Sequence, residues 1–177
     1  AMTASAINNA DEMGKAAQKA GLGVNEFSKL AYAADLAGIS SETLGGSLNK
    51  LGKALVEAAS NPSSEAARAF AAMGVAVRDS EGRVRELGSV FLEVSDKFAT
   101  YNDGAEKGAL AMKVFGKSGT EIIPLLNSGG EAIRQLGEDI QGVTTESAAQ
   151  AETFNDNIEK MRVQLAEVGT TLAKAVL

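Results

Sequence analysis

The sequence contains neither cysteine nor histidine. Without cysteine the chain has no disulfide bond, no thiolate metal ligand and no cysteine nucleophile. Without histidine it lacks the side chain that most often acts as a general base at neutral pH and as a metal ligand. From these absences we expect a protein that is not an enzyme, with no catalytic residue, no metal and no cofactor.

Proline and aromatic residues are also scarce. The chain has only 2 prolines and no tryptophan, and aromatic residues make up 5% of it, whereas glycine occurs 19 times. Because abundant alanine favours helices and interior proline breaks them, the composition predicts helices separated by glycines. No apolar run approaches the roughly 20 residues that cross a bilayer, so we expect no membrane span.

The net charge is −6, with a pI near 4.8. An acidic chain is repelled by phosphate backbones, whose neutralisation by lysine and arginine supplies most non-specific affinity for nucleic acids. We therefore expect the isolated chain not to bind nucleic acid.

Apolar residues recur at helical spacing along most of the chain. Leu44, Leu48, Leu51 and Leu55 are separated by steps of four, three and four, which forms one continuous stripe. Gly38 follows the preceding helix where a glycine commonly ends one. We expect helices over residues 3–20, 24–37, 40–59, 89–101, 103–116 and 131–140, with a further helix capped by Ser63 after Pro62 and a short one opened by Ser118.

Asp103 is expected to open the helix over residues 103–116. Glu106 follows it three residues later, and this spacing is similar to that of a capping box.

The stretch "VAVRDSEGRVREL" differs from its surroundings because apolar and polar residues alternate around the turn residues "DSEG". Alternation of this kind predicts a β-hairpin, with residues 75–78 paired to residues 83–86. A lone hairpin is only marginally stable in water, so it would have to pack on a helix.

The last segment is predicted to be one helix of about thirty residues, capped by Thr144 or Thr145, well above the usual helix length. Its apolar residues alternate steps of four and three over about four heptads, a pattern typical of a coiled coil or a long packing helix. Since the pattern reaches the last residue, we expect a fragment of a longer protein. The candidate self-association seam is Phe154, Ile158, Met161, Leu165, Val168 and Leu172. The alternative is that this seam folds back onto the rest of the chain.

These observations predict an all-α fold, predominantly a compact helical bundle with one small β-hairpin and a long C-terminal helix. Residues 1–2 are interpreted as an expression remnant. Residues 3–142 form the compact module, with the hairpin near residues 75–86. Residues 143–177 form the heptad-patterned helix, expected to continue beyond the fragment.

Two motifs resemble ligand sites. "GKSGTE" at residues 116–121 is similar to the end of a phosphate-binding loop, but a helical pattern precedes it and the required upstream glycine is missing. We interpret it as a glycine that ends one helix and a serine that caps the next. Residues 24–59 are similar to a helix-turn-helix, in which the first residues of the second helix contact bases. None of those residues is lysine or arginine, and the segment holds three lysines against four carboxylates.

Three longer stretches together resemble a known family. They are "EFSKLAYAADLAGISSETLGGSLNKLGKAL", "AARAFAAMGVAVRDSEGRVREL" and "DGAEKGALAMKVFGKSGTEIIPLLNSG". In this order they resemble a module of the tail tape measure proteins of long-tailed phages and prophages, over nearly the whole chain from about Asp11 to Leu177. The family offers no catalytic residues that could be assigned to this module.

The resemblance implies a structural and assembly protein that sets tail length and scaffolds the tail tube. It implies four kinds of partner, namely further copies of the chain, tail tube subunits, tail assembly chaperones and tail-tip proteins. It also implies a location in the virion tail, and in the cytoplasm of the bacterial host during assembly. The alternative function is a helix-turn-helix-like nucleic-acid binding module at residues 24–59.

Overall fold

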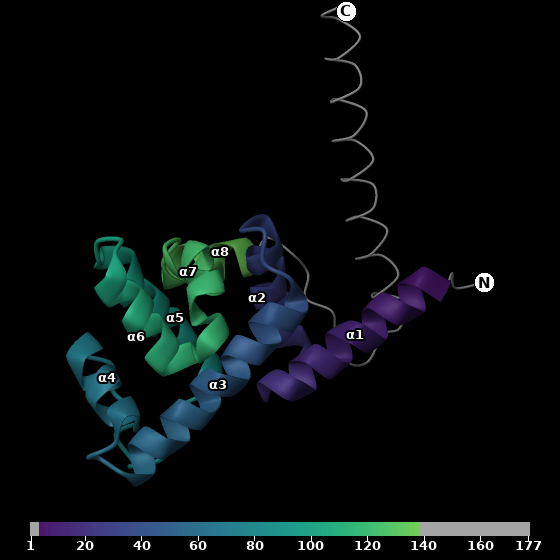
Figure 1. Cartoon of the computed structure of the whole chain (residues 1–177). Helices are drawn as coiled ribbons and strands as arrows, with labels where there is room; N and C mark the ends of the chain where they lie inside the picture. Colours follow the sequence, from purple (N-terminus) through teal and green to yellow (C-terminus); the bar gives the residue numbers. More distant parts are fainter. Residues whose placement is uncertain (1–3, 139–177) are drawn as a thin grey trace, which may run out of the picture.

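A computed structural model of the chain describes residues 4–138. All regular secondary structure in this range is helical, which confirms the predicted all-α class (Figure 1). The elements, in chain order, are α1 (Ala4–Ala20), α2 (Val24–Leu36), α3 (Ser41–Ser60), α4 (Glu65–Met73), α5 (Leu87–Thr100), α6 (Ala105–Phe115), the 3₁₀-helix η1 (Lys117–Ile122), α7 (Ile123–Leu126) and α8 (Gly130–Glu138).

Helix α3 is the central element of the described module. It contacts α1 and α2 near its beginning, α4 towards its end, and α5, α6 and η1 along its length (Figure 1). The predicted leucine stripe faces this interior, and all four of its leucines are buried. Burial of such a stripe removes apolar surface from water along one whole side of the helix, which is the main stabilising contribution that a packed helix makes.

Aromatic rings fill the core between α5 and α6. Phe115 meets Phe91 and Phe98 edge to face, with ring centroids 6.2 Å apart in both pairs. All three rings are fully buried. Edge-to-face pairs place the positive edge of one ring against the negative face of another, so the geometry adds to the gain from burial alone.

The junction between α2 and α3 follows the sequence closely. Gly38 has a φ of +76°, and the N–H of Ile39 donates to the carbonyl oxygen of Ala34 over 2.8 Å, which closes the end of α2. Ser40 then accepts a hydrogen bond from the N–H of Thr43 over 3.1 Å. Both the predicted helix end at Gly38 and the predicted cap at Ser40 are confirmed.

We expect Gly38→Val to lower the free energy of unfolding by about 1–2 kcal/mol, because a β-branched residue is strained at positive φ. Nothing lies within 4 Å of an added Cβ at this position, so a loss reports backbone strain rather than a clash. Chemical denaturation of Gly38→Val beside Gly38→Asn, which tolerates the left-handed region better, measures it. Equal stability of the two variants would contradict this explanation.

The predicted β-hairpin is not formed. Residues 75–86 make a single antiparallel bridge, between Arg78 and Val84, and no strand. Two features explain the difference. The carboxylate of Asp79 accepts the N–H groups of Glu81 and Arg83 and so holds the turn by a side chain. Val84 is 42% exposed, so the second segment has no buried face that would hold it as a strand.

Two predicted caps are also wrong. Ser64, rather than Ser63, caps α4 by accepting from the N–H of Ala67. Gly116 does end α6, with a φ of +74°, but η1 begins at the next residue without a side-chain cap, so Ser118 has no such role. Gly116 is thus the turn between α6 and η1, and the rest of the "GKSG" stretch forms the beginning of η1.

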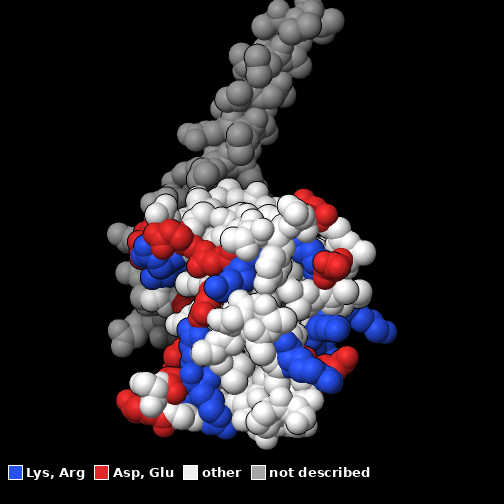
Figure 2. Space-filling view, turned by 90° about the vertical axis from the view of Figure 1, so that its left-hand side faces the viewer, with Lys and Arg blue, Asp and Glu red and all other residues white. Residues whose placement is uncertain are grey.

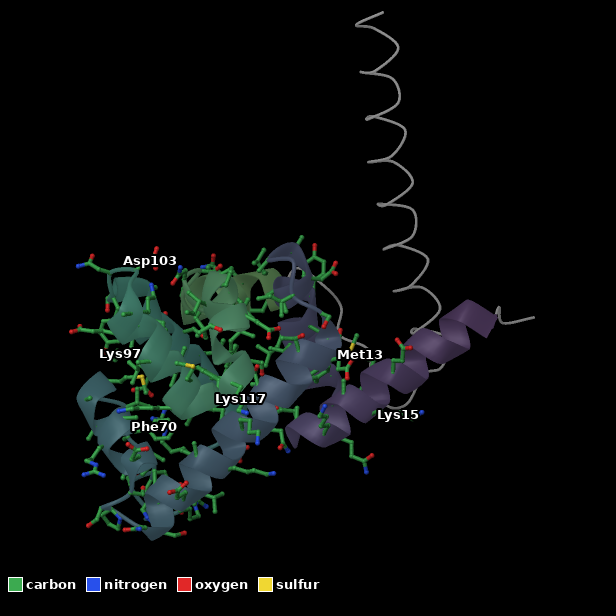
Figure 3. The ribbon with its side chains drawn as sticks, in the orientation of Figure 1. Met13, Lys15, Phe70, Lys97, Asp103 and Lys117 are labelled. Carbon is green, nitrogen blue, oxygen red and sulfur yellow. The ribbon has the colours of Figure 1, made fainter. Side chains whose placement is uncertain are left out.

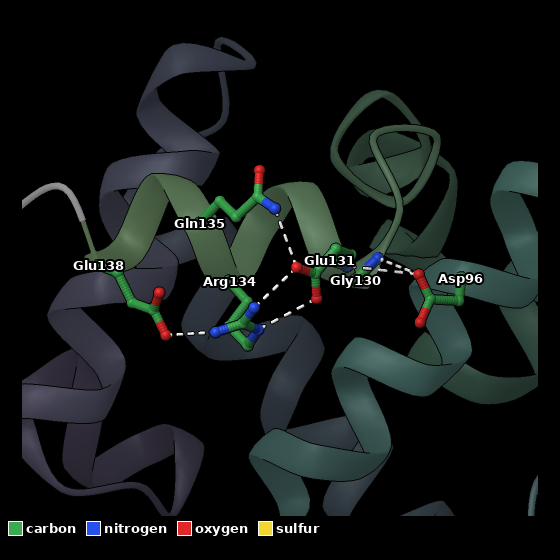
Figure 4. Close-up of polar contacts among 6 residues, drawn as sticks. All are labelled: Asp96, Gly130, Glu131, Arg134, Gln135 and Glu138. Carbon is green, nitrogen blue, oxygen red and sulfur yellow. Dashed lines mark hydrogen bonds and ion pairs between the residues drawn. The ribbon is translucent and has the colours of Figure 1, made fainter.

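Helix α8 closes the module against α5 and α2. A carboxylate oxygen of Asp96, on α5, accepts the N–H of Gly130 over 2.7 Å, which satisfies one of the free donors at the start of α8 (Figure 4). Arg134 then pairs with Glu131 and Glu138 on the outer side of α8. Gly130 lies so close to Leu92 of α5 that an added Cβ would overlap the Leu92 backbone.

The predicted heptad helix, residues 143–177, lies outside the described residues. So do its six seam residues: Phe154, Ile158, Met161, Leu165, Val168 and Leu172. Their self-association therefore remains a prediction from the sequence. None of the helices between residues 4 and 138 is long and apolar enough to cross a membrane.

Candidate interaction surface

The helix pair formed by α2 and α3 does not present a surface that could contact DNA bases. Gly45 is buried against α1, where an added Cβ would stand 3.1 Å from the carbonyl oxygen of Ala16. Asn49, one turn later, donates to the carbonyl oxygen of Lys19 over 2.7 Å. A recognition helix must expose its first turns to a groove, whereas α1 covers this part of α3. The packing therefore argues against the nucleic-acid alternative for residues 24–59.

Four exposed lysines lie on or beside α3. Lys50 and Lys53 are three residues apart on α3, and so are neighbours on its surface. The Lys19 ammonium is 4.0 Å from the place of an added Cβ on Gly46, one turn before Lys50. Lys117 follows Gly116, against which the Lys50 side-chain carbons pack, and Figure 3 places it at η1 beside α3. We call Lys19, Lys50, Lys53 and Lys117 the lysine face.

The lysine face brings together four cations that have no carboxylate partner among the described residues. Its four side chains are exposed, and none forms an ion pair with a described residue. Several other cations are paired, as in Arg83–Asp79, Arg85–Glu93, Lys107–Asp103 and Arg134–Glu131. The lysine face therefore holds positive charge that the described module does not neutralise.

Lys107, unlike the lysines of the lysine face, is buried and has a structural role. Its ammonium is buried and donates to the Tyr101 carbonyl oxygen and to an Asp103 carboxylate oxygen, each over 2.9 Å. The hydrogen bond from Lys107 and its charge lower the pKa of Asp103. The predicted cap at Asp103 is wrong, because Gly104 occupies the cap position of α6 and Asp103 binds Lys107 instead. This pair fixes the turn between α5 and α6.

Two carboxylates stand together at the junction of α2 and α5. Burial raises the pKa of Glu26, and repulsion from Glu86 raises it further. The Glu26 carboxylate lies against Gly88, where an added Cβ would overlap it. Glycine at the start of α5 thus makes room for this carboxylate.

The side of the module that carries α4 and α6 has a broad area without charge (Figure 2). Exposed residues without charge on these two helices include Ala71 and Ala72 on α4, and Ala109 and Met112 on α6. Met112 is 49% exposed, which is unusual for a large apolar side chain. The positive lysine face and this neutral side give the module surfaces of different character.

Among residues 4–138, no group of three or more aspartates and glutamates is placed to hold a metal ion. Sequence inspection missed the lysine face because Lys19 and Lys117 are distant in sequence from α3. The only signal in the sequence was the three-residue spacing of Lys50 and Lys53.

A family model described as "Phage-related minor tail protein" matches residues 3–116, which span α1 to α6. No curated protein and no solved structure matches the chain significantly.

Proposed function

Because the chain belongs to the family of phage-related minor tail proteins, we propose that it is a segment of a tail tape measure protein. Membership of the family indicates a structural role in the phage tail, association with other tail components and a place in the virion tail. It also suggests a protein that is not an enzyme. The more specific proposal is that the parent protein sets tail length and scaffolds assembly of the tail tube.

The family match is the single observation that carries this proposal. Two features support it. The three stretches that resemble tape measure modules extend past the matched range into α7. The described part is entirely helical in its regular structure, and a helix converts residues to length at 1.5 Å per residue, which suits a ruler.

The two parts of the chain would then do different things. The compact module would be a folded unit within the tape measure protein. It would contact tail tube subunits, tail-tip proteins or assembly chaperones. Residues 143–177 would lead into the rod that measures length and would contact further copies of the chain. Assembly would take place in the host cytoplasm before the protein is enclosed in the tail.

Deletion within the parent phage gene tests the ruler. We expect removal of residues 143–177 in frame to shorten tails by about 50 Å, because about 35 helical residues rise 1.5 Å each. A duplication of the same segment should lengthen tails by the same amount. Electron microscopy of tails measures both.

Substitution provides the matched control. A segment of equal length with the same heptad pattern but different residues should leave tail length unchanged, since only the rise matters. Tails of normal length after both the deletion and the duplication would show that this segment does not measure length. Loss of all tails in every variant, the substituted one included, would instead indicate that its specific residues are needed for assembly, and would contradict the ruler for this segment.

A further inference from the structure

The lysine face has a counterpart in the sequence that follows α8. Residues 139–159 carry five carboxylates and neither lysine nor arginine. Three of them, Glu152, Asp156 and Glu159, are spaced by four and three residues. That spacing places them on one side of a helix of the kind that the heptad pattern predicts. We call these three residues the carboxylate stripe.

We propose that the lysine face is an intramolecular docking site for the carboxylate stripe of the same chain. The two surfaces are complementary in charge and in spacing, because Lys50 and Lys53 also stand on one side of a helix, three residues apart. The proposal goes beyond the assignment to a tape measure and does not depend on it.

The signs of the charges fix a register. With the two helices parallel, Lys50 meets Glu152 and Lys53 meets Asp156. One turn further on, the exposed Glu57 of α3 then meets Lys160. In this register all three positions oppose unlike charges, whereas a uniformly anionic partner would meet Glu57 with repulsion. The mixed signs on α3 therefore favour this segment over a nucleic acid.

The length of chain allows the contact. Thirteen residues, 139–151, separate α8 from Glu152. Residues 139–143 span up to about 18 Å when extended, and the predicted helical residues 144–151 add about 12 Å. A module of this size has a radius of gyration of only about 14 Å. The reach of about 30 Å is about twice this radius, which is long enough for the carboxylate stripe to lie against a neighbouring helix of the module.

Tethering makes docking within one chain stronger than docking between chains. Exposed ion pairs contribute little individually and are screened by salt. A short tether, however, holds the segment at a millimolar effective concentration, so that a few weak pairs suffice. Two separate copies at micromolar concentration would lack this advantage.

Docking would leave the seam exposed. Phe154 and Ile158 follow Glu152 and Asp156 by two residues, which is about 200° around a helix, so the seam would face away from the module. Docking and association through the seam could therefore occur together.

Zero-length crosslinking of the full chain tests the contact. A carbodiimide joins a carboxylate to an amine only when the two touch. We expect crosslinks from the lysine face to the carboxylate stripe at low salt, and their loss in 1 M salt. An equal mixture of ¹⁴N- and ¹⁵N-labelled chains, digested and analysed by mass spectrometry, shows whether each crosslink lies within one chain. The Lys107–Asp103 pair, at 2.9 Å, serves as the internal positive control.

Charge reversal tests the residues. In Lys50→Glu/Lys53→Glu, the yield of crosslinks from the carboxylate stripe to the remaining lysines should fall about fivefold, the effect of losing two exposed ion pairs. Adding Glu152→Lys/Asp156→Lys should restore docking, measured as new crosslinks from the lysines introduced into the stripe to the glutamates introduced on α3. The matched control, Arg68→Glu/Lys97→Glu, changes the net charge equally at cations that have no ion pair with a described residue, and should leave the yield unchanged.

Three outcomes would overturn the proposal. The first is the absence of crosslinks to the carboxylate stripe while the Lys107–Asp103 crosslink forms. The second is crosslinks that occur only between differently labelled chains, which would make the lysine face an interface between copies. The third is an equal loss in the control variant. Circular dichroism melts of all variants confirm that the module remains folded during the comparison.

Discussion

Replacing Gly130 by alanine should lower the free energy of unfolding by about 3 kcal/mol, although alanine is the better helix former. An added Cβ would overlap the backbone of Leu92 on α5, so the two helices would have to move apart. That movement would also stretch the 2.7 Å hydrogen bond from the Gly130 N–H to Asp96. Urea denaturation followed by circular dichroism measures the loss.

Gly52→Ala is the matched control for Gly130→Ala. Gly52 is also a helical glycine, but the nearest atom to an added Cβ, on Leu87, is 3.6 Å away, which is an ordinary contact. We expect this variant to gain up to about 1 kcal/mol from its higher helix propensity. If both variants were stabilised, α8 would not approach α5 as closely as the structure shows.

Truncating Phe115 to alanine should have the largest effect of any single substitution considered, a loss of about 3–5 kcal/mol. The side chain is fully buried and contacts both Phe91 and Phe98 edge to face, so its removal leaves a cavity that the two remaining rings cannot fill. Thermal and urea unfolding of the variant measure the loss.

Two further variants separate cavity formation from a general effect on α6. Phe115→Leu should lose less, because leucine fills part of the same volume. Met112→Ala, on the same helix but 49% exposed, should change stability by less than about 0.5 kcal/mol. Losses of similar size for Met112→Ala and Phe115→Ala would contradict the view that the cavity left by the buried ring causes the loss at Phe115.

Sequence inspection predicted the features that depend on residues close together in the chain. The leucine stripe of α3, the helix end at Gly38 and the cap at Ser40 each follow from a local pattern, and each is present in the structure. The hairpin prediction was wrong for a reason outside the pattern. Alternation at residues 75–86 indicates a strand only if one side becomes buried, and Val84 is exposed.

The lysine face and the Gly130 contact could not be predicted in this way. Lys19 and Lys117 are 98 residues apart in the sequence, and they stand near α3 only because α1 and η1 both pack against it. In the sequence, "NSGG" is typical of a loop, and nothing there indicates that Gly130 lies against the backbone of Leu92. Only the structure shows this contact. Both depend on distances between elements that are remote in sequence, which composition and periodicity do not contain.

The packing of α8 against α2 has a consequence for synthesis on the ribosome. Gly137 of α8 lies against Lys29 of α2, so the first part of the chain is completed by the last described helix. At about 5–20 residues per second, the hundred or so intervening residues take roughly 5–20 s to emerge. During that time the side of α2 that packs against α8 stays without its final cover. The nascent chain thus passes through an interval in which it is prone to aggregation and open to capture by a holding factor.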